Sequence, residues 1–488
     1  MTSAHRPSNS SSGKSAAAWV ALPFLLVTLA AIASGRIPAR VRYDQLLYHE
    51  PVVRGFLRQW PTFDFYDYLS ATTPGYHLLL AVVARLFHPS TMALQIASAL
   101  IGAVFVGVVA AACGVRAGVA RAVAFTAPLA CSLYVFSSAA WLLPDNLAWL
   151  CVTLILLISL RSAFSTRCAV VGSVILVGLV FTRQIHLWAA APLWAAAFLR
   201  PTGGAEANLA DYFRSRLATR VGRAALAVVF TVPAFILILM FVRLWGGLTP
   251  PRFQQQYGSV NAASVPFFLA VLGGLSMFFL PTLLPRLREL ARNRTRLGLI
   301  AGASLVAAVI PPTNFDYYAG RRTGLWNVVQ KFPVIADHTS LLVLVLAVWG
   351  GVALAAWLGG FDLRRRLVLL VALAGFWAAQ AASVELWQRY VEPFALVLLA
   401  IFASTSVGGG LPVESPVGAP NAHWRRRAEV TFPLVLALGF AGLNVRSLWS
   451  APMVSEGPPG ARSPDDASET PVPTEIVVPP KAQRGLWW

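Results

Sequence analysis

The sequence predicts an all-α, multi-pass integral membrane protein whose chain crosses the bilayer about thirteen times. Of its 488 residues, 57% are hydrophobic and only 12% are charged, whereas a soluble chain has roughly 25% charged residues. Thirteen long apolar runs alternate with polar segments, and many approach the ~20 residues that an α-helix needs to cross the hydrocarbon core. This composition argues against both a soluble enzyme and a disordered chain.

The thirteen apolar runs are the predicted transmembrane helices. In chain order they lie at 15–34, 91–112, 122–140, 147–160, 168–181, 187–199, 223–245, 264–284, 297–312, 339–359, 367–383, 390–406 and 430–449. The shorter runs suggest tilted helices or a locally thinner bilayer. Together they define one membrane domain, residues 16–449. Residues 1–15 are polar, and we expect a disordered cytoplasmic N-terminus, while the Pro-rich residues 450–488 should form an extended extracytoplasmic tail.

A further apolar run, residues 73–87, decides the predicted topology, because it contains His77 and Arg85 and either crosses the membrane or lies on its surface. If it lies on the surface and the N-terminus is cytoplasmic, the Arg-rich loops all face the cytoplasm, as the positive-inside rule requires. If it crosses, they all move outside. We therefore expect a short surface helix there. The segments then predicted on the outer face are 35–90, 141–146, 182–186, 246–263, 313–338, 384–392 and the tail.

The charges indicate a membrane surface rather than nucleic acid. The net charge is +19, but the basic residues fall between the apolar runs and not on one face, so we expect no nucleic-acid partner. Acidic residues are scarce, and none lies in the middle of a predicted span. A proton- or cation-coupled transporter carries ionisable groups there. The placement of the acids therefore favours chemistry at the outer surface.

The outer segment 35–90 is the richest in candidate functional residues. Asp44 follows the first predicted span and precedes apolar positions that alternate with Arg54 and Arg58. This pattern indicates an amphipathic helix on the membrane surface. Spacing alone leaves two interpretations of Asp44 open, a cap for that helix or a catalytic carboxylate.

Several sequence elements together resemble one family of membrane enzymes. The matching residues are Asp44-Gln45, Tyr48-His49, Trp60 with Asp64, Thr72-Thr73-Pro74-Gly75-Tyr76, Asp145, Phe181-Thr182-Arg183-Gln184, Glu385, Arg389-Tyr390 and Pro393. They resemble the dolichyl-phosphate-glucose α-1,2-glucosyltransferases of the N-glycan pathway, a family of GT-C glycosyltransferases. Gln45 stands where the family has a second acid, and one Pro of its Thr-Thr-Pro-Pro-Gly element is missing. We therefore expect a prokaryotic relative with a different acceptor.

The resemblance implies a GT-C-type helical bundle and an inverting enzyme that moves a hexose from a polyprenyl-phosphate sugar to a lipid-linked glycan or another acceptor hydroxyl. Because the leaving group is a phosphate, the chemistry chiefly needs a base for the acceptor, and we choose Asp44. Asp145 either assists Asp44 or caps a turn in Pro144-Asp145-Asn146. The expected active site faces the outside of a prokaryotic plasma membrane.

The lipid phosphate needs cations, and Arg183 and Arg389 lie at the outer ends of predicted spans. A fixed guanidinium binds phosphate through two parallel hydrogen bonds, although either side chain could instead snorkel to lipid headgroups. If Glu385 and Arg389 continue one helix, they share a face and the carboxylate holds the guanidinium. Gln184 and Tyr390 complete the predicted substrate-binding set on this side.

His49 is expected to shape the acceptor site. Although His77 and His186 also face outward, no pair of these histidines has the spacing of metal ligands, and we expect no metal. The chain shows no phosphate-binding glycine loop and no nucleotide fold, which fits a lipid-linked donor and no cofactor. The expected partners are the donor, the acceptor and membrane lipids. The alternative functions are a transporter or flippase of lipid-linked sugars, and a polymerase or ligase of surface polysaccharide.

Overall fold

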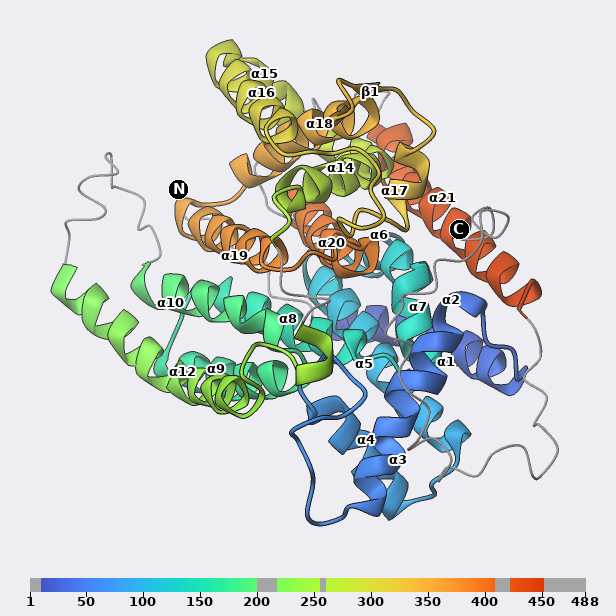
Figure 1. Ribbon diagram of the computed structural model, residues 1–488. Coiled ribbons are helices and arrows are strands. Elements are labelled where there is room, and N and C mark those ends of the chain that lie inside the picture. The colour runs from blue at the N-terminus through green and yellow to red at the C-terminus, as the bar shows by residue number, and fades with distance from the viewer. Residues whose placement is uncertain (1–9, 200–216, 255–259, 409–421, 452–488) are drawn as a thin grey trace.

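The computed structural model describes residues 10–199, 217–254, 260–408 and 422–451, which form a helical bundle (Figure 1). The N-terminal part comprises α1 (Ser10–Ala33), α2 (Ala39–Tyr43), the π-helical η1 (Asp44–His49), α3 (Glu50–Arg58), α4 (Gly75–Leu86) and α5 (Thr91–Ala117). The middle part comprises α6 (Val119–Cys131), α7 (Leu133–Ala140), α8 (Asp145–Ser159), α9 (Thr166–Thr182), the 3-10 helix η2 (Gln184–Ala189), α10 (Ala190–Phe198), α12 (Leu217–Trp245) and η3 (Pro251–Phe253).

The C-terminal part completes the bundle. It comprises α14 (Ser264–Ser276), η4 (Met277–Phe279), α15 (Leu280–Ala291), α16 (Arg294–Val309), α17 (Leu325–Val329), β1 (Val334–Ile335), β2 (Thr339–Ser340), α18 (Leu341–Gly359), α19 (Leu363–Ala381), the 3-10 turn η5 (Gln388–Tyr390), α20 (Glu392–Gly408) and α21 (Ala422–Trp449). The two short strands pair antiparallel, with Val334 opposite Ser340. They form a small hairpin before α18.

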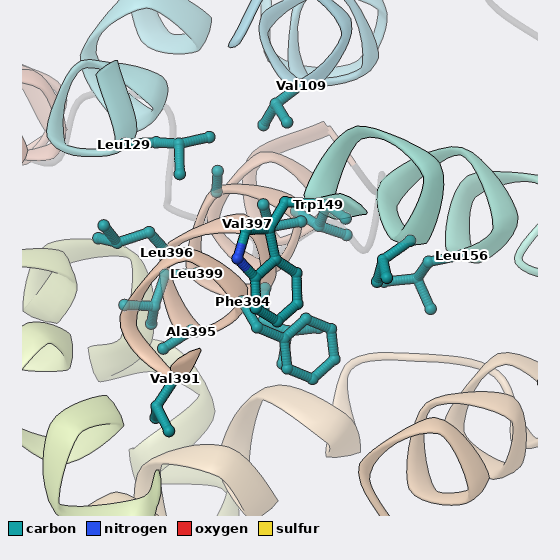
Figure 2. Packing of buried hydrophobic residues seen from close by; sticks show 14 of the residues in the cluster. Val109, Leu129, Trp149, Leu156, Val391, Phe394, Ala395, Leu396, Val397 and Leu399 are labelled. Carbon is teal, nitrogen blue, oxygen red and sulfur yellow. The ribbon is translucent and has the colours of Figure 1, made fainter. Parts of the chain in front are cut away.

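Helix α20 lies at the centre of the bundle. Its sequence is apolar on all sides, and a helix that is hydrophobic all round is buried. It packs against α5, α6 and α14, as Figure 1 shows. In Figure 2, Phe394 of α20 stacks on Trp149 of α8 with ring centroids 5.8 Å apart, and Val109 of α5 and Leu129 of α6 lie around them. This core fixes the turn just before α20, which carries Arg389.

The protein is a helical, multi-pass membrane protein, as predicted. Within the described ranges, six helical segments are long and apolar enough to cross a membrane: α1, α5, α12, α14 with α15, α18 and α21. The α6–α7 pair would be a seventh, although its two helices meet at 67°. Helices occupy each of the predicted apolar runs, but several are shorter, and the count of about thirteen spans stays a prediction.

The segments predicted on the outer face come together at one end of the bundle. The Asn261 side chain donates to the backbone carbonyls of Ala319 and Val384, at 3.0 and 2.8 Å. Arg252 pairs with Asp67 of the first predicted outer segment. The shared end is what the predicted topology requires, and the face of the membrane that it occupies stays a prediction.

Segments predicted to be cytoplasmic meet at a different place. The buried guanidinium of Arg364, at the start of α19, donates to backbone carbonyls of Ser159, Arg161, Ala196 and Leu199. It thereby closes the ends of α8 and α10, whose last carbonyls have no partner within their own helices. A cation near helix C-termini is also favoured by the helix dipoles.

Two predicted boundaries differ from the structure. Residues up to 15 were expected to be disordered, whereas α1 begins at Ser10, because its first turns pack closely on α5, with Gly13 and Gly114 at the contact. Residues 1–9 and 452–488 lie outside the described ranges. The predicted span at 122–140 is broken at Ser132, whose hydroxyl accepts from the Tyr134 N–H and so starts a new helix.

Candidate active site

Of the arginine–carboxylate pairs at the end of the bundle where the predicted outer segments meet, three contain predicted site residues. The pairs are Arg389 with Asp44, Arg183 with Asp145, and Arg322 with Glu385. Each joins segments that are at least 38 residues apart in the chain. Five of the six residues, all except Arg322, belong to the predicted catalytic and substrate-binding set, so the fold brings together most of what the sequence singled out.

Asp44 is the first residue of the π-helical η1, and its carboxylate Oδ2 accepts a hydrogen bond from Arg389 Nη1 at 2.5 Å. Both side chains are 22% exposed. Neither neighbouring helix has a side-chain cap at this junction, so the capping interpretation of Asp44 does not describe its contact. Arg389 donates to one oxygen of the Asp44 carboxylate, Oδ2. The other oxygen, Oδ1, remains available to a hydroxyl group of a substrate.

The segment that carries Arg389 is held in place by the loop before the hairpin. The Leu325 N–H donates to Gln388 Oε1 at 2.6 Å, and the Trp326 indole donates to the Leu386 carbonyl at 2.9 Å. Gln388 also donates to Glu392, at the start of α20. These bonds make an irregular segment rigid, which a guanidinium needs if it is to bind an anion in a fixed orientation.

Arg183 and Asp145 form the more buried pair, with side chains 11% and 10% exposed. Arg183 caps the C-terminal end of α9 in an extended conformation, and Asp145 is the first residue of α8. The N-cap of α8 is Pro144 and has no side-chain hydrogen bond. The carboxylate of Asp145 therefore serves Arg183 rather than capping the helix.

Aromatic rings contact all three guanidiniums. Arg389 lies 4.4 Å from the Trp387 ring centroid and 5.0 Å from that of Tyr390, and Arg183 lies 4.9 Å from the Tyr390 centroid. Trp387 and Tyr390 stack with centroids 5.5 Å apart, and Arg322 lies 5.6 Å from Trp387. The attraction between each guanidinium and an aromatic ring offsets part of the electrostatic repulsion between the neighbouring arginines.

The prediction that Glu385 holds Arg389 on one helix face is wrong. The chain between α19 and η5 is not helical, so residues four apart do not share a face. Glu385 instead accepts from Arg322 at 2.5 Å, across 63 residues of chain. Burial raises the pKa of the Glu385 carboxyl, while the charge of Arg322 opposes that shift.

His49 forms an unexpected contact with His77 of α4. The His49 Nδ1 and His77 Nε2 atoms lie 2.9 Å apart, and both rings are buried. Burial, with the positive charges of Arg389 and Arg183, lowers the pKa of His49 to about 3. His49 is therefore a neutral imidazole beside two cations.

Gln184 uses its amide to join predicted outer segments. Its Nε2 donates to the carbonyls of Ala71 and Leu248 at 2.7 and 2.9 Å, and its Oε1 accepts from the Thr73 N–H at 3.1 Å. Next to it, a Cβ added to Gly75 would lie 2.6 Å from the Phe181 carbonyl oxygen. The Thr-Thr-Pro-Gly element therefore seats α4 against the end of α9, beside Arg183.

Gln45, which stands where the resembled family has an acid, points away from the pairs. Its amide contacts Gln95 and Glu50, each at 3.3 Å, and is fully buried. Arg322 and Trp387 lie at this site although they are not among the residues predicted from the sequence. Trp387 had a signal in the sequence, since it lies between Glu385 and Arg389, whereas Arg322 is one of three cations in the predicted outer segment 313–338 and does not stand out there.

A small cavity lies beside Arg183. It is lined by Trp149, Arg183, Ile185, His186, Gln380 and Tyr390. Among the residues that the structure describes, no three His, Cys, Asp or Glu side chains are grouped so that they could hold a metal ion. The absence of a metal requirement stays a prediction.

Comparison with known proteins gives distant structural likenesses only. No protein-family model and no curated protein matches the sequence. ArnT from Cupriavidus metallidurans bound to undecaprenyl phosphate is 16% identical, with a TM-score of 0.35 over 88% of this chain and 89% of that chain. Its apo structure is 16% identical, with a TM-score of 0.36 over 80% and 78%.

The Archaeoglobus fulgidus oligosaccharyltransferase, tethered to an acceptor peptide, is 14% identical, with a TM-score of 0.32 over 85% of this chain and 59% of that chain. TM-scores of this size do not establish a common fold. The function below is therefore proposed from the contacts and motifs of this chain.

Proposed function

We propose that this protein is a membrane glycosyltransferase of the GT-C type that transfers a hexose from a polyprenyl-phosphate sugar to an acceptor hydroxyl on a lipid-linked or other glycan. The observation that carries the proposal is the contact between Asp44 and Arg389. It places a carboxylate able to accept a proton directly beside a guanidinium able to bind a phosphate. Transfer from a lipid phosphate needs both groups at one place.

In the proposed reaction, the acceptor hydroxyl attacks the anomeric carbon of the donor sugar and gives its proton to Asp44. The bond between that carbon and the phosphate oxygen breaks, and the phosphate keeps the electron pair. A single displacement of this kind inverts the anomeric centre. Asp44 Oδ1 is the oxygen that Arg389 leaves available, and the residual exposure of the side chain allows a hydroxyl to approach it.

Arg389 and Arg183 are proposed to bind the donor phosphate. The two guanidiniums lie on the ring of Tyr390, at 5.0 and 4.9 Å from its centroid, so an anion could contact both. Charge that develops on the leaving phosphate is stabilised best by donors that are already fixed in place. Asp44 and Asp145 supply that fixing, because each holds one guanidinium through an ion pair.

The remaining predicted residues are proposed to have supporting roles. Glu385 and Arg322 extend the site past Trp387, toward the exposed Tyr317, whose ring lies 4.4 Å from Arg322. Aromatic faces beside arginine suit the stacking of a sugar ring, so we assign this side to the acceptor or the donor sugar. Gln184 positions the loops around Arg183, and we further propose an outward-facing site in a prokaryotic plasma membrane.

The proposal is tested with the purified full-length protein and a panel of polyprenyl-phosphate sugars. Release of polyprenyl phosphate is measured for the wild type and for Asp44→Asn. We expect release from at least one donor, dependent on added acceptor, and its loss in Asp44→Asn. Transport of an intact lipid-linked sugar across a vesicle membrane, without release of polyprenyl phosphate from any donor, would overturn the assignment.

A further inference from the structure

The hydrogen bond between His49 and His77 runs edge to edge. The two nitrogens lie 2.9 Å apart, and the ring centroids lie 5.2 Å apart with the planes at only 22°. Two imidazole rings stacked face to face with a contact of 2.9 Å would have centroids much closer together than 5.2 Å. The rings are instead nearly coplanar, so that one N–H points directly at the lone pair of the other ring.

Only one of these two nitrogens can carry the proton, and the surroundings of His77 decide which. His77 is fully buried, and its other nitrogen, Nδ1, has no hydrogen-bond partner among the described residues. A buried N–H without an acceptor is rarer in proteins than an unfilled acceptor. The proton of His77 therefore belongs on Nε2, from which it is donated to His49 Nδ1.

The tautomer of His49 follows from that of His77. A neutral imidazole has one N–H and one acceptor nitrogen, so a His49 whose Nδ1 accepts must carry its proton on Nε2. Nε2 is on the opposite edge of the ring from the contact with His77. It is the nitrogen that remains for a ligand.

We infer that His77 is a positioning residue that fixes His49 as the Nε2–H tautomer, and that His49 donates this hydrogen bond to the anionic phosphate of the lipid donor. The inference deepens the proposed function and rests on it for the identity of the ligand. His49 and Asp44 are the two ends of the six-residue π-helical η1. In a π-helix, residues five apart are joined by a backbone hydrogen bond, which keeps the two side chains near one another.

A neutral donor has an advantage in this place. Burial and the charges of Arg389 and Arg183 keep the pKa of His49 at about 3, so the ring carries no charge at physiological pH. It can bind an anionic oxygen without adding a third cation to the two guanidiniums. A lysine or arginine there would add repulsion between like charges.

The first test reads the tautomer and does not depend on activity. The full-length protein is labelled with ¹⁵N-imidazole histidine, and the His49 and His77 signals are assigned with His49→Gln and His77→Gln. We expect a protonated Nε2 and an unprotonated Nδ1 in both rings. In His77→Leu, His49 loses its fixed tautomer and should show a mixture. A protonated Nδ1 on His49 in the wild type would overturn the inference.

The second test measures the affinity of the full-length protein for farnesyl phosphate, a short polyprenyl phosphate. The Gln amide nitrogen reaches the place of histidine Nε2, whereas that of Asn reaches the place of Nδ1. We expect His49→Gln to stay within about threefold of the wild type, and His49→Asn to bind roughly 10-fold more weakly, the scale of one hydrogen bond to a charged group.

The same assay separates a positioning role of His77 from a packing role. His77→Gln keeps an amide N–H for His49, and we expect near wild-type affinity, whereas His77→Leu should weaken binding by roughly two- to tenfold. His88→Leu, at an exposed histidine of the same outer segment, is the control and should not change it. Equal binding by His77→Leu and His77→Gln, at wild-type melting temperature, would contradict the inference.

The two proposals fail in different ways. If Arg389→Ala and Arg183→Ala also bind farnesyl phosphate as the wild type does, the phosphate site of the proposed function is wrong. If these two variants lose binding while His49→Asn does not, the phosphate site stands and the donor role of His49 is overturned.

Discussion

Asp44 and Arg389 are 345 residues apart in the chain, and their side chains meet at 2.5 Å. One lies at the start of the π-helical η1 and the other in the turn before the buried helix α20. The contact therefore ties the first predicted outer segment to the core of the bundle. It also means that the proposed base and the proposed phosphate ligand influence each other, so their roles must be separated by substitutions that change one property at a time.

Asp44→Asn should abolish most sugar transfer. Asparagine keeps the size of the side chain and can still accept a hydrogen bond from Arg389, but it cannot take a proton from the acceptor. We expect the transfer rate to fall by ~10²-fold or more, the usual scale for a general base. Turnover and farnesyl phosphate affinity are measured on the same preparation, and the affinity should change little.

Asp64→Asn and Asp67→Asn are the matched controls for Asp44. Asp64 accepts from the Tyr66 N–H in a local turn, and Asp67 pairs with Arg252 on the surface, so neither reaches the three central pairs. Both variants should keep most of the transfer activity. A fully active Asp44→Asn enzyme would remove Asp44 as the base.

Arg389→Lys should weaken donor binding although the charge is kept. Arg389 donates to Asp44 and to the Tyr390 hydroxyl from two different nitrogens, and a lysine ammonium cannot reproduce that planar fork. Arg389→Ala should weaken binding further. A charge-assisted hydrogen bond contributes ~1.5–3 kcal/mol, which corresponds to roughly a 10- to 150-fold lower affinity for Ala.

Arg252→Lys is the control for Arg389, because its pair with Asp67 is about one-third exposed. We expect no change in the affinity for farnesyl phosphate. Equal affinities for the wild type, Arg389→Lys and Arg389→Ala would show that Arg389 only snorkels, and Arg183 would then be the remaining candidate for the phosphate.

The Arg183–Asp145 pair should show strong coupling in a double-mutant cycle. Removing one partner of a buried pair leaves the other charge without compensation, at a cost of about 3–5 kcal/mol. Arg183→Leu and Asp145→Leu should each lower the melting temperature markedly, and the double variant should lose less than the sum. The same cycle at Arg252 and Asp67 should give about 0–1 kcal/mol. Additive losses at the buried pair would contradict this prediction.

Cysteine reporters test the predicted topology. Reporters at Ala39 and Ser90 should label from the same, outer side, because the helix α4 between them is predicted to lie on the surface. A reporter at Gly258 should also label from outside and one at Ser215 should not; both positions lie outside the described residues. Labelling of Ala39 and Ser90 from opposite sides would show that α4 crosses the membrane.

The sequence was sufficient to predict which segments would share one end of the bundle. The distribution of arginine sorts the loops into two groups, and the segments that carry Asp44, Asp145, Arg183 and Arg389 fall in one group. The helical class followed from the apolar runs. The arginine content of a loop and the hydrophobicity of a segment are local properties of the sequence, so both can be read without knowing the tertiary contacts.

The sequence was not sufficient to predict which acid pairs with which cation. The spacing of Glu385 and Arg389 indicated a pair only if the chain between them were helical. The Leu386 N–H instead bonds to the Gly320 carbonyl at 3.2 Å, which draws the segment away from a helix and brings Glu385 to Arg322. The π-helical turn at Asp44 and the His49–His77 contact likewise depend on how α4 packs, which no local spacing reports.

Acid should destabilise the wild type more than the His49→Gln variant. Burial and the charges of Arg389 and Arg183 lower the pKa of folded His49 from 6.5 to about 3, so the folded state favours the neutral ring. The stabilisation is complete above pH 6.5 and is lost as the pH falls from there toward 3. At pH 4.5 the free energy of unfolding should be lower by on the order of 1–3 kcal/mol. The wild type should therefore show a steeper fall in melting temperature between pH 7 and pH 4.5 than the His49→Gln variant.

The variants separate His49 from the other titrating groups. Glutamine does not titrate, so His49→Gln should flatten the dependence of melting temperature on pH, while His88→Gln should keep the wild-type slope. Parallel slopes for the wild type and His49→Gln would mean that His49 is not held neutral in the folded protein.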